Sequence, residues 1–155
     1  MEAVFGRVET IQVDGRAVSI LLIKNPAGAN EVLRTLLLEA HPSDNGRGLD
    51  LWIALNDGIA DGRDVSWIWD ADFELLAGQV RHVACTGTRA AEMAVRLKYA
   101  GLPPEAITVD EAIDRSIDRA VADADGSLFA LPTYTALLEL RNLLAKRGLA
   151  RRYWA

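Results

Sequence analysis

The segment Leu49–Leu55 constrains the fold of this chain more than any other. Six of its seven residues are apolar. A run this short and this continuous is typical of a β-strand that is buried on both faces, and such strands belong to parallel sheets covered by helices. A second segment, Val80–Thr86, has the same character. The two segments therefore predict a parallel sheet between two helical layers.

The flanking segments indicate that strands and helices alternate. An antiparallel hairpin is expected at the start, where Val8–Val13 and Ala17–Ile23 flank the turn residues Asp14-Gly15. Pro26 suits the first position of a helix, and apolar residues then recur at helical spacing. The elements expected in the second half are a helix capped by Thr88 and reaching Ala100, a strand over 106–109, a helix capped by Asp110, a strand over 127–131, and a helix from Pro132 to about Arg147.

This order of elements predicts an α/β fold. Close alternation of strands and helices is typical of βαβ units with right-handed crossovers. We therefore expect a three-layer, Rossmann-like domain with a mostly parallel sheet that opens with an antiparallel hairpin. A length of 155 residues fits one such domain.

Composition narrows the classes of partner. The formal net charge of −5 argues against nucleic acid as the main partner. No apolar run is long enough to span a bilayer, and the first ten residues lack the apolar segment of a signal peptide. We expect a cytoplasmic protein without a transmembrane segment.

Cys85 is the only cysteine, which excludes an internal disulfide and a cysteine zinc site within the chain. It lies three residues after His82 on an expected strand, so the two side chains should point to opposite faces of the sheet. We therefore expect a buried structural thiol rather than a Cys–His nucleophile.

Ligands of open α/β sheets bind at the carboxyl ends of the strands, which here selects three segments: 24–30, 56–72 and 86–89. The second is the most unusual, because Trp67 and Trp69 lie among its aspartates. One interpretation is a solvated acidic loop. The other is that apolar bulk beside acids creates a partly dry surface that docks a partner or tunes an acid. The aspartates are Asp57, Asp61, Asp64, Asp70 and Asp72.

Metal and hydrolase chemistry fit this acidic segment poorly. With Asp57 at the first position of an EF-hand, Ile59 and Ile68 fall where oxygen ligands are required. His41 and His82 are the only histidines, and neither has a ligand at motif spacing, so no metal site is predicted. There is also no GxSxG motif. The acids are therefore expected to belong to a site that another chain completes.

The other two segments have weak features of anion sites. Lys24 supplies charge near Gly28 at a helix start, and Arg89 follows Gly87 in the first turn of another helix. A helix-entry turn and a solvated arginine explain the same residues equally simply. Because the sequence contains no GxxxxGK[ST] motif, the chain can at most close over ATP that is held elsewhere.

Five segments are distinctive in combination: FGRVE, KNPAGAN, LNDGIADGRDVSWIWDADFE, TGTRAAEMAVRLKYAG and ALPTYTALLELRNLLAKRG. Together they resemble the carboxy-terminal domain of the MurT family, the Mur-ligase-like subunits of lipid II isoglutaminyl synthase. The resemblance covers nearly the whole chain in the right order. It implies one Mur-ligase-type carboxy-terminal domain over residues 1–155, excised from a longer subunit whose central ATP-binding domain is absent here.

The resemblance also implies a reaction. In this family, ATP with Mg²⁺ activates the α-carboxyl of D-glutamate in the stem peptide of lipid II, and ammonia attacks the acyl phosphate. A GatD-type glutaminase subunit releases the ammonia from glutamine and takes its triad acid from MurT. That acid corresponds to Asp64, the second aspartate of the DGRD segment. The domain alone is expected to be inactive and to hold no cofactor tightly.

Further site residues follow from the same family. Arg7, Lys24 and Asn25 match positions near the nucleotide site. Gly58 stands where the family commonly has Asn, which puts a side-chain role there in doubt. The residues expected at the partner interface are Trp67, Trp69, Asp61 and Asp70.

Two alternatives remain open from the residues alone. One is a stand-alone nucleotide- or cation-binding regulatory module, with the acidic loop as a cation pocket. The other is a small hydrolase that uses Asp64 or Asp70 as nucleophile. Such an enzyme needs an activating base or a metal ion, and the sequence shows no ligand set for either.

Overall fold

A computed structural model describes residues 8–39 and 47–149 of the chain. Within these ranges six strands form one sheet in the order β1-β2-β6-β3-β4-β5. Only β1 and β2 pair antiparallel, whereas the other neighbours are parallel. The strands are β1 (Glu9–Val13), β2 (Arg16–Ile20), β3 (Leu49–Ala54), β4 (Val80–Thr86), β5 (Ile107–Val109) and β6 (Leu128–Pro132).

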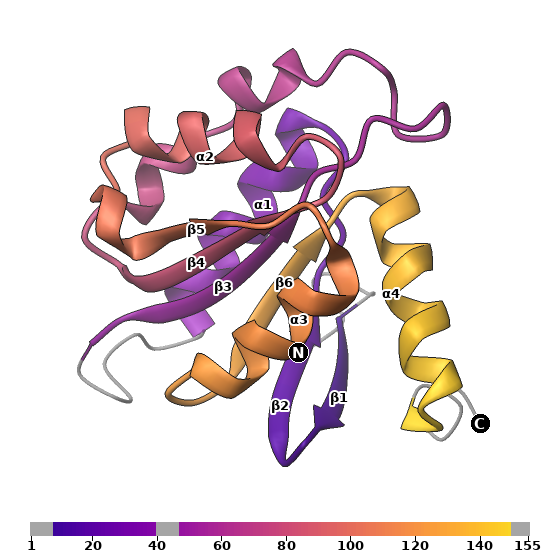
Figure 1. Ribbon diagram of the computed structural model, residues 1–155. Coiled ribbons are helices and arrows are strands. Elements are labelled where there is room, and N and C mark those ends of the chain that lie inside the picture. Colours follow the sequence, from indigo (N-terminus) through magenta and orange to yellow (C-terminus); the bar gives the residue numbers. More distant parts are fainter. Residues whose placement is uncertain (1–7, 40–46, 150–155) are drawn as a thin grey trace.

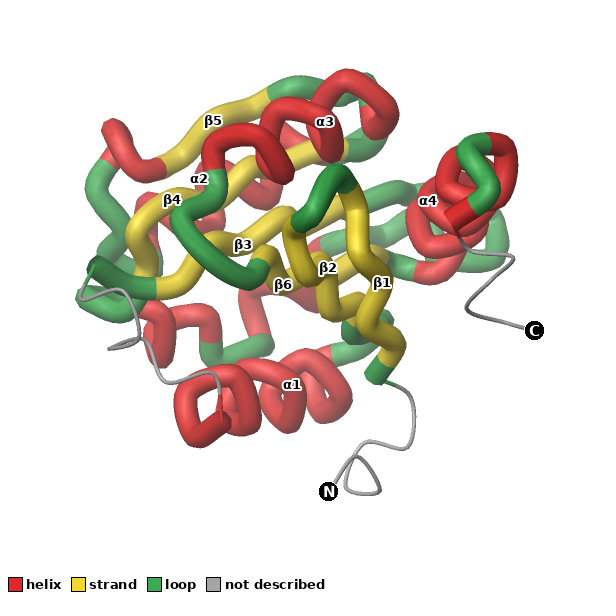
Figure 2. The backbone as a smooth tube through the Cα atoms, turned by 90° about the horizontal axis from the view of Figure 1, so that it is seen from below, coloured by secondary structure: helices red, strands yellow, loops and turns green. Residues whose placement is uncertain are grey.

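Helices cover both faces of this sheet. One layer contains α1, α2 and two 3-10 turns, and the other contains α3 and α4. Figure 2 shows α1 and α3 on opposite sides of the strands. The elements are α1 (Pro26–Glu39), α2 (Ala90–Tyr99), α3 (Ile113–Asp123) and α4 (Tyr134–Lys146), with 3-10 turns η3 (Ser66–Asp70), η4 (Phe73–Leu76) and η5 (Pro104–Ala106).

The strand β3 lies inside the sheet between β4 and β6, and all six of its residues are buried. Successive side chains point to opposite layers, so Leu51 joins the α1–α2 core and Trp52 joins the α3–α4 core. The polar residue of the run, Asp50, is buried and accepts a hydrogen bond of 2.7 Å from Nε of Arg81. The expected three-layer α/β fold, with a mostly parallel sheet and an opening hairpin, is confirmed.

The hairpin turn also follows the prediction. Asp14 has φ 51° and Gly15 has φ 81°. Two consecutive residues with positive φ are the signature of the tight turns that match the twist of antiparallel strands. An aspartate followed by a glycine adopts this geometry at low cost.

Three predicted helix starts are wrong. Helix α2 begins at Ala90 without a side-chain cap, because Thr88 is bound to Asp57 instead. Helix α3 begins at Ile113, and Asp110 accepts the N–H of Ala112 in the turn before it. Pro132 ends β6 rather than opening a helix.

The position of Pro132 has a simple physical reason. Proline lacks an N–H group but retains its carbonyl, which here accepts a hydrogen bond of 3.0 Å from the N–H of Ile23. The residue therefore fits the end of an interior strand, and α4 starts two residues later at Tyr134. In the described part of the chain, no helix is long and apolar enough to cross a membrane.

Candidate functional site

The three segments selected from the sequence meet at one edge of the sheet. Parallel strands end at the same edge, so the residues after β2, β3, β4 and β6 lie together. Backbone hydrogen bonds join these ends: the N–H of Leu55 donates to Thr86, and the N–H of Thr133 donates to Ala54. The prediction that these segments share the carboxyl edge is confirmed.

Asn56 links the loops at this edge. It directly follows β3 and is buried. Its backbone N–H donates to Oγ1 of Thr133 at 3.1 Å, and its side-chain Nδ2 donates to Oγ1 of Thr135 at 3.0 Å and to Glu139 at 3.3 Å. Its Oδ1 accepts the N–H of Thr88 at 3.0 Å. One amide side chain therefore fixes the start of the acidic segment against the segments that follow β4 and β6.

Gly87 is required by this packing. It has φ 97°, and a Cβ there would lie 2.6 Å from the carbonyl oxygen of Leu55 and 2.7 Å from Oδ1 of Asn56. Both distances are shorter than any real Cβ contact. Glycine therefore lets the chain pass close to β3 as it enters α2.

Asp57 and Arg89 form an ion pair beside this turn. Nη1 of Arg89 donates to Asp57 at 3.1 Å, while its Nη2 donates to Glu92 at 2.8 Å. Oγ1 of Thr88 donates to Asp57 at 2.9 Å. The hydrogen bonds from Arg89 and Thr88 lower the pKa of Asp57. Because two carboxylates of its own chain hold the Arg89 guanidinium, this residue is poorly suited to bind an external anion.

Asp61 is likewise bound by its own chain. Its carboxylate accepts the N–H of Thr135 at 2.8 Å and the N–H of Gly58 at 3.0 Å, and it also binds the Thr135 hydroxyl. Thr135 lies in the first turn of α4, where backbone N–H groups lack helical partners. A Cβ at Gly58 would lie 3.1 Å from Oδ2 of Asp61, so glycine leaves room for the loop to close on this carboxylate.

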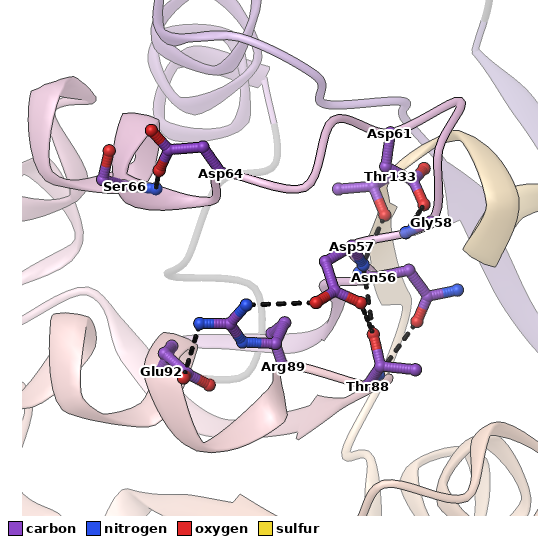
Figure 3. Close-up of polar contacts among 10 residues, drawn as sticks. All are labelled: Asn56, Asp57, Gly58, Asp61, Asp64, Ser66, Thr88, Arg89, Glu92 and Thr133. Atoms are coloured by element: carbon purple, nitrogen blue, oxygen red, sulfur yellow. Dashed lines mark hydrogen bonds and ion pairs between the residues drawn. The ribbon is translucent and has the colours of Figure 1, made fainter.

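These residues form what we call the internal polar network, drawn in part in Figure 3. Every charged or amide group in it is bound by another residue of the same chain. Sequence reasoning missed its centre, Asn56, although a polar residue directly after a buried run was a usable signal. The network consists of Asn56, Asp57, Asp61, Thr88, Arg89, Thr133 and Thr135.

Asp64 differs from these acids. Its side chain is exposed, and its hydrogen-bond partner among the described residues is Ser66, whose N–H donates to Oδ1 at 2.9 Å. This backbone bond, the Ser66 hydroxyl and the nearby charge of Arg89 lower the pKa of Asp64, so the carboxylate is ionised at neutral pH. Figure 3 shows Asp64 apart from the hydrogen bonds around Asn56.

Asp64 is one of the residues that line a surface pocket of about 240 Å³. The segment from Arg63 to Ser66 forms one side, and Arg89 and Glu92 reach it from α2 and its entry turn. Trp69 lies on its wall. We call this hollow the Asp64 pocket. It combines an ionised acid with an aromatic wall on the outer surface of the domain.

The two tryptophans of the acidic segment have different environments. Trp67 is half-buried and packs against the α1–α2 core, whereas Trp69 is 47% exposed. The Trp69 ring meets the edge of Tyr99 with a centroid distance of 5.6 Å, and the Arg96 guanidinium lies 5.1 Å from its centroid. Of the two, Trp69 presents the larger surface to a second molecule.

Arg96 fixes the segment that carries Trp69. Its side chain is 2% exposed. Nε donates to the carbonyl of Ile68 at 2.7 Å, and Nη2 donates to the carbonyl of Ala71 at 2.7 Å and to Glu74 at 2.9 Å. The hydrogen bond from Arg96 lowers the pKa of Glu74. This buried cation binds η3 and η4 to α2, and sequence reasoning did not identify it.

The remaining candidate residues lie at or outside this edge. Oδ1 of Asn25 accepts the N–H of Gly28 at 2.8 Å and so caps α1, while Lys24 is exposed beside it. Asp70 is exposed. Arg7 and His41 lie outside the described residues.

Metal and thiol chemistry find little support in the described ranges. No group of three or more His, Cys, Asp or Glu residues there could hold a metal ion. Cys85 packs in the α1–α2 core, while His82 lines a small pocket with α3, so the predicted opposite orientation is confirmed. Burial raises the pKa of Cys85 to about 12, which leaves it an inert thiol at neutral pH.

Comparisons with known proteins agree on one family. The model of the MurT ligase C-terminal family matches residues 22–137. The lipid II isoglutaminyl synthase (glutamine-hydrolyzing) subunit MurT of Streptococcus pneumoniae is 37% identical over 151 residues, which are 97% of this chain and 32% of the relative. The subunit of the same name from Staphylococcus aureus strain COL is 39% identical over 144 residues, or 90% of this chain and 30% of the relative.

The chain thus spans about a third of the length of these relatives. The family model covers well over half of the chain, including β3, β4, β6 and the whole acidic segment. The chain therefore belongs to the MurT ligase C-terminal family.

Proposed function

We propose that this chain is the carboxy-terminal domain of an ATP-dependent subunit that amidates D-glutamate in the stem peptide of cytoplasmic lipid II. The ammonia comes from glutamine, which a separate GatD-type glutaminase subunit hydrolyses. Support comes from the family and from relatives that are named as glutamine-hydrolysing lipid II isoglutaminyl synthase subunits. The domain alone performs no reaction.

Within that assembly, Asp64 supplies the acid of the glutaminase triad. The partner subunit provides a cysteine, which attacks the glutamine amide, and a histidine, which carries the proton to the departing ammonia. The acid accepts the second imidazole N–H, fixes its tautomer and stabilises the imidazolium. An acid can do this from another chain if the interface holds it rigidly.

The observation that carries this assignment is the environment of Asp64. Asp57 and Asp61 are both bound by groups of their own chain. Asp64 is ionised, exposed and held by a single neighbour, Ser66. It is therefore ready to accept an N–H group from outside the domain.

The Asp64 pocket also offers the interface that such an acid requires. Trp69 lines this pocket and the exposed Asp70 follows it in the chain, while Trp67 anchors the same turn in the core. Aromatic residues that are fixed before binding make effective contacts because they lose little conformational freedom. Asp61 contributes inside the domain. Its carboxylate binds Thr135 of α4 and so holds the loop that precedes Asp64.

The family resemblance assigns ATP with Mg²⁺ to the central domain of the subunit. In the domain described here, Lys24 is exposed at the carboxyl edge of the sheet. Lys24 would approach the phosphates when the domain closes, and Asn25 would position Lys24 through the α1 cap.

The test is Asp64→Asn in the full-length subunit, assembled with the glutaminase subunit of the same organism. We expect glutaminase turnover to fall about 10⁴-fold, as in the triad from which this magnitude is taken. Amidation driven by an added ammonium salt should remain near the wild-type rate, since it bypasses the glutaminase. Asp72→Asn is the matched control, because Asp72 is an exposed acid of the same segment that does not line the Asp64 pocket.

Unchanged glutaminase turnover in Asp64→Asn would contradict the assignment of this acid. Loss of ammonium-driven amidation as well would place the defect in the ligase reaction or in folding. If even the wild-type assembly shows no glutamine-dependent amidation, the proposed reaction is contradicted.

A further inference from the structure

Helix α2 carries an exposed ridge next to the Asp64 pocket. Glu92, Val95 and Tyr99 are spaced three and four residues apart, so they lie on one face of the helix. Val95 is 45% exposed and Tyr99 is 75% exposed. The opposite face of α2 is buried against the sheet through Met93 and Leu97. Val95 and Tyr99 therefore form an exposed ridge, beginning beside the charged Glu92, that the core of this domain does not use.

The ridge is continuous with the Asp64 pocket. Glu92 lines that pocket together with Trp69, and the Trp69 ring contacts the ring of Tyr99. Figure 1 shows α2 and the preceding segment on the side of the sheet away from α4. A protein that covers both Asp64 and Trp69 can therefore also contact Tyr99.

The aromatic part of this surface is fixed before any partner arrives. Arg96 lies beneath Trp69, is buried, and is bound to two backbone carbonyls of the same turn. Trp69 therefore loses little freedom when it is covered. Preformed clusters of Trp, Tyr and Arg are the typical energetic centres of protein interfaces.

We infer that the ridge of α2, formed by Val95 and Tyr99 with Trp69 at its end, docks the glutaminase subunit and carries most of the binding energy of that contact. This inference rests on the proposed function. The occupant is the glutaminase surface that flanks its histidine, because the same protein must cover Asp64. Trp67 contributes by holding the turn in place, since it faces the core.

The charges around the ridge fit this occupant. Asp64 is an exposed carboxylate that lines the same pocket as Trp69, whereas Glu92 is paired with Arg89. A histidine that becomes positively charged during turnover is complementary to Asp64. The apolar residues then exclude water from the contact between the histidine and Asp64.

The experiment measures binding of the purified glutaminase subunit to the full-length ligase subunit by titration calorimetry. Tyr99→Ala and Val95→Arg should each raise Kd about tenfold or more. Leu138→Arg is the matched control, because Leu138 is 39% exposed on α4, on the other face of the sheet. It should leave Kd within about twofold, as expected for a surface substitution outside an interface.

Several outcomes distinguish a failure of the docking surface from a failure of the proposed function. If Tyr99→Ala and Val95→Arg bind like the wild type while Asp64→Asn abolishes glutaminase turnover, the ridge is not the docking surface and the proposed function stands. Equal weakening by Leu138→Arg would also overturn the inference. If the wild-type ligase subunit does not bind the glutaminase subunit, the proposed function itself is contradicted. Ammonium-driven amidation at the wild-type rate verifies that each variant is folded.

Discussion

Two regions at the same edge of the sheet use aspartates in opposite ways. In the internal polar network, Asp57 and Asp61 accept hydrogen bonds from Arg89, Thr88, Thr135 and Gly58. In the Asp64 pocket, the acid is exposed and held by Ser66 alone among the described residues. The first region determines the path of the backbone, and the second presents a charge to the outside.

The difference shows how one acidic segment can serve structure and chemistry together. A carboxylate that is to orient a foreign histidine needs a rigid backbone and unused hydrogen-bonding capacity. The internal polar network supplies the rigid backbone, because Asn56 and Asp61 tie the segment to the connections that follow β4 and β6. Asp64 has the unused capacity because the network ends before it.

The largest effect on stability is expected at Gly87, within the network. Gly87→Ala places a Cβ 2.6 Å from the carbonyl of Leu55 at φ 97°. The free energy of unfolding should fall by about 3 kcal/mol through strain and overpacking. Urea denaturation followed by tryptophan fluorescence measures it.

Gly126→Ala is the control for that substitution. A Cβ at Gly126 meets no atom within 4 Å, and its φ lies outside the left-handed region. Its free energy of unfolding should change by less than about 0.5 kcal/mol. If Gly87→Ala were equally neutral, the network would be less tightly packed than the structure indicates.

A smaller effect is expected at Asp61. Asp61→Asn replaces one acceptor oxygen with an NH₂ group that faces the N–H donors of Gly58 and Thr135. The free energy of unfolding should fall by about 2 kcal/mol, because hydrogen bonds to a charged group are lost. The same denaturation experiment measures it.

Asp64→Asn, measured in the same denaturation experiment, tests the contrast between the two regions. Its exposed side chain makes no contact that α4 or β6 depends on, so the free energy of unfolding should stay close to that of the wild type. A stability loss at Asp64 equal to that at Asp61 would show that both acids are structural and would end the contrast between the two regions.

The smallest effect is expected from acid. Arg89 and Thr88 hold the pKa of Asp57 below its value in the unfolded chain. The stabilisation from Asp57 is therefore complete above pH of about 4, the unfolded value, and is lost as the pH falls through the lower folded pKa. Unfolding free energies measured between pH 6 and pH 3 should decline less in Asp57→Asn than in the wild type. An identical decline would mean that this ion pair does not contribute.

The fold was largely predictable from the residues. Continuous apolar runs such as Leu49–Leu55 and Val80–Thr86 have few alternatives to a covered parallel sheet. The Asp14-Gly15 turn and the Pro26 helix start are local signals, and both were correct. Helix starts at Thr88 and Pro132 were wrong, since a side chain and a carbonyl found partners far away in the sequence. The start at Asp110 was wrong because Asp110 binds Ala112 and Arg115 in a turn before the helix.

The candidate site was predictable only in part. The carboxyl-edge rule placed the acidic segment correctly, and the family resemblance pointed to Asp64. No periodic pattern predicts the 3-10 turns η3 and η4, because Arg96 from α2 holds them through hydrogen bonds to the backbone carbonyls of Ile68 and Ala71. Trp69 is the more exposed of the two tryptophans, and its position also depends on the packing of Arg96 against its ring.

The sequence by itself determined the layered α/β architecture and the family, because hydrophobic patterning and motif order are properties of the linear chain. Only the tertiary structure decided that Asp57 and Asp61 are bound by groups of their own chain while Asp64 remains exposed. That distinction depends on hydrogen-bond donors such as Thr135 and Arg89, which lie tens of residues away and reach the acidic segment only after the strands have paired.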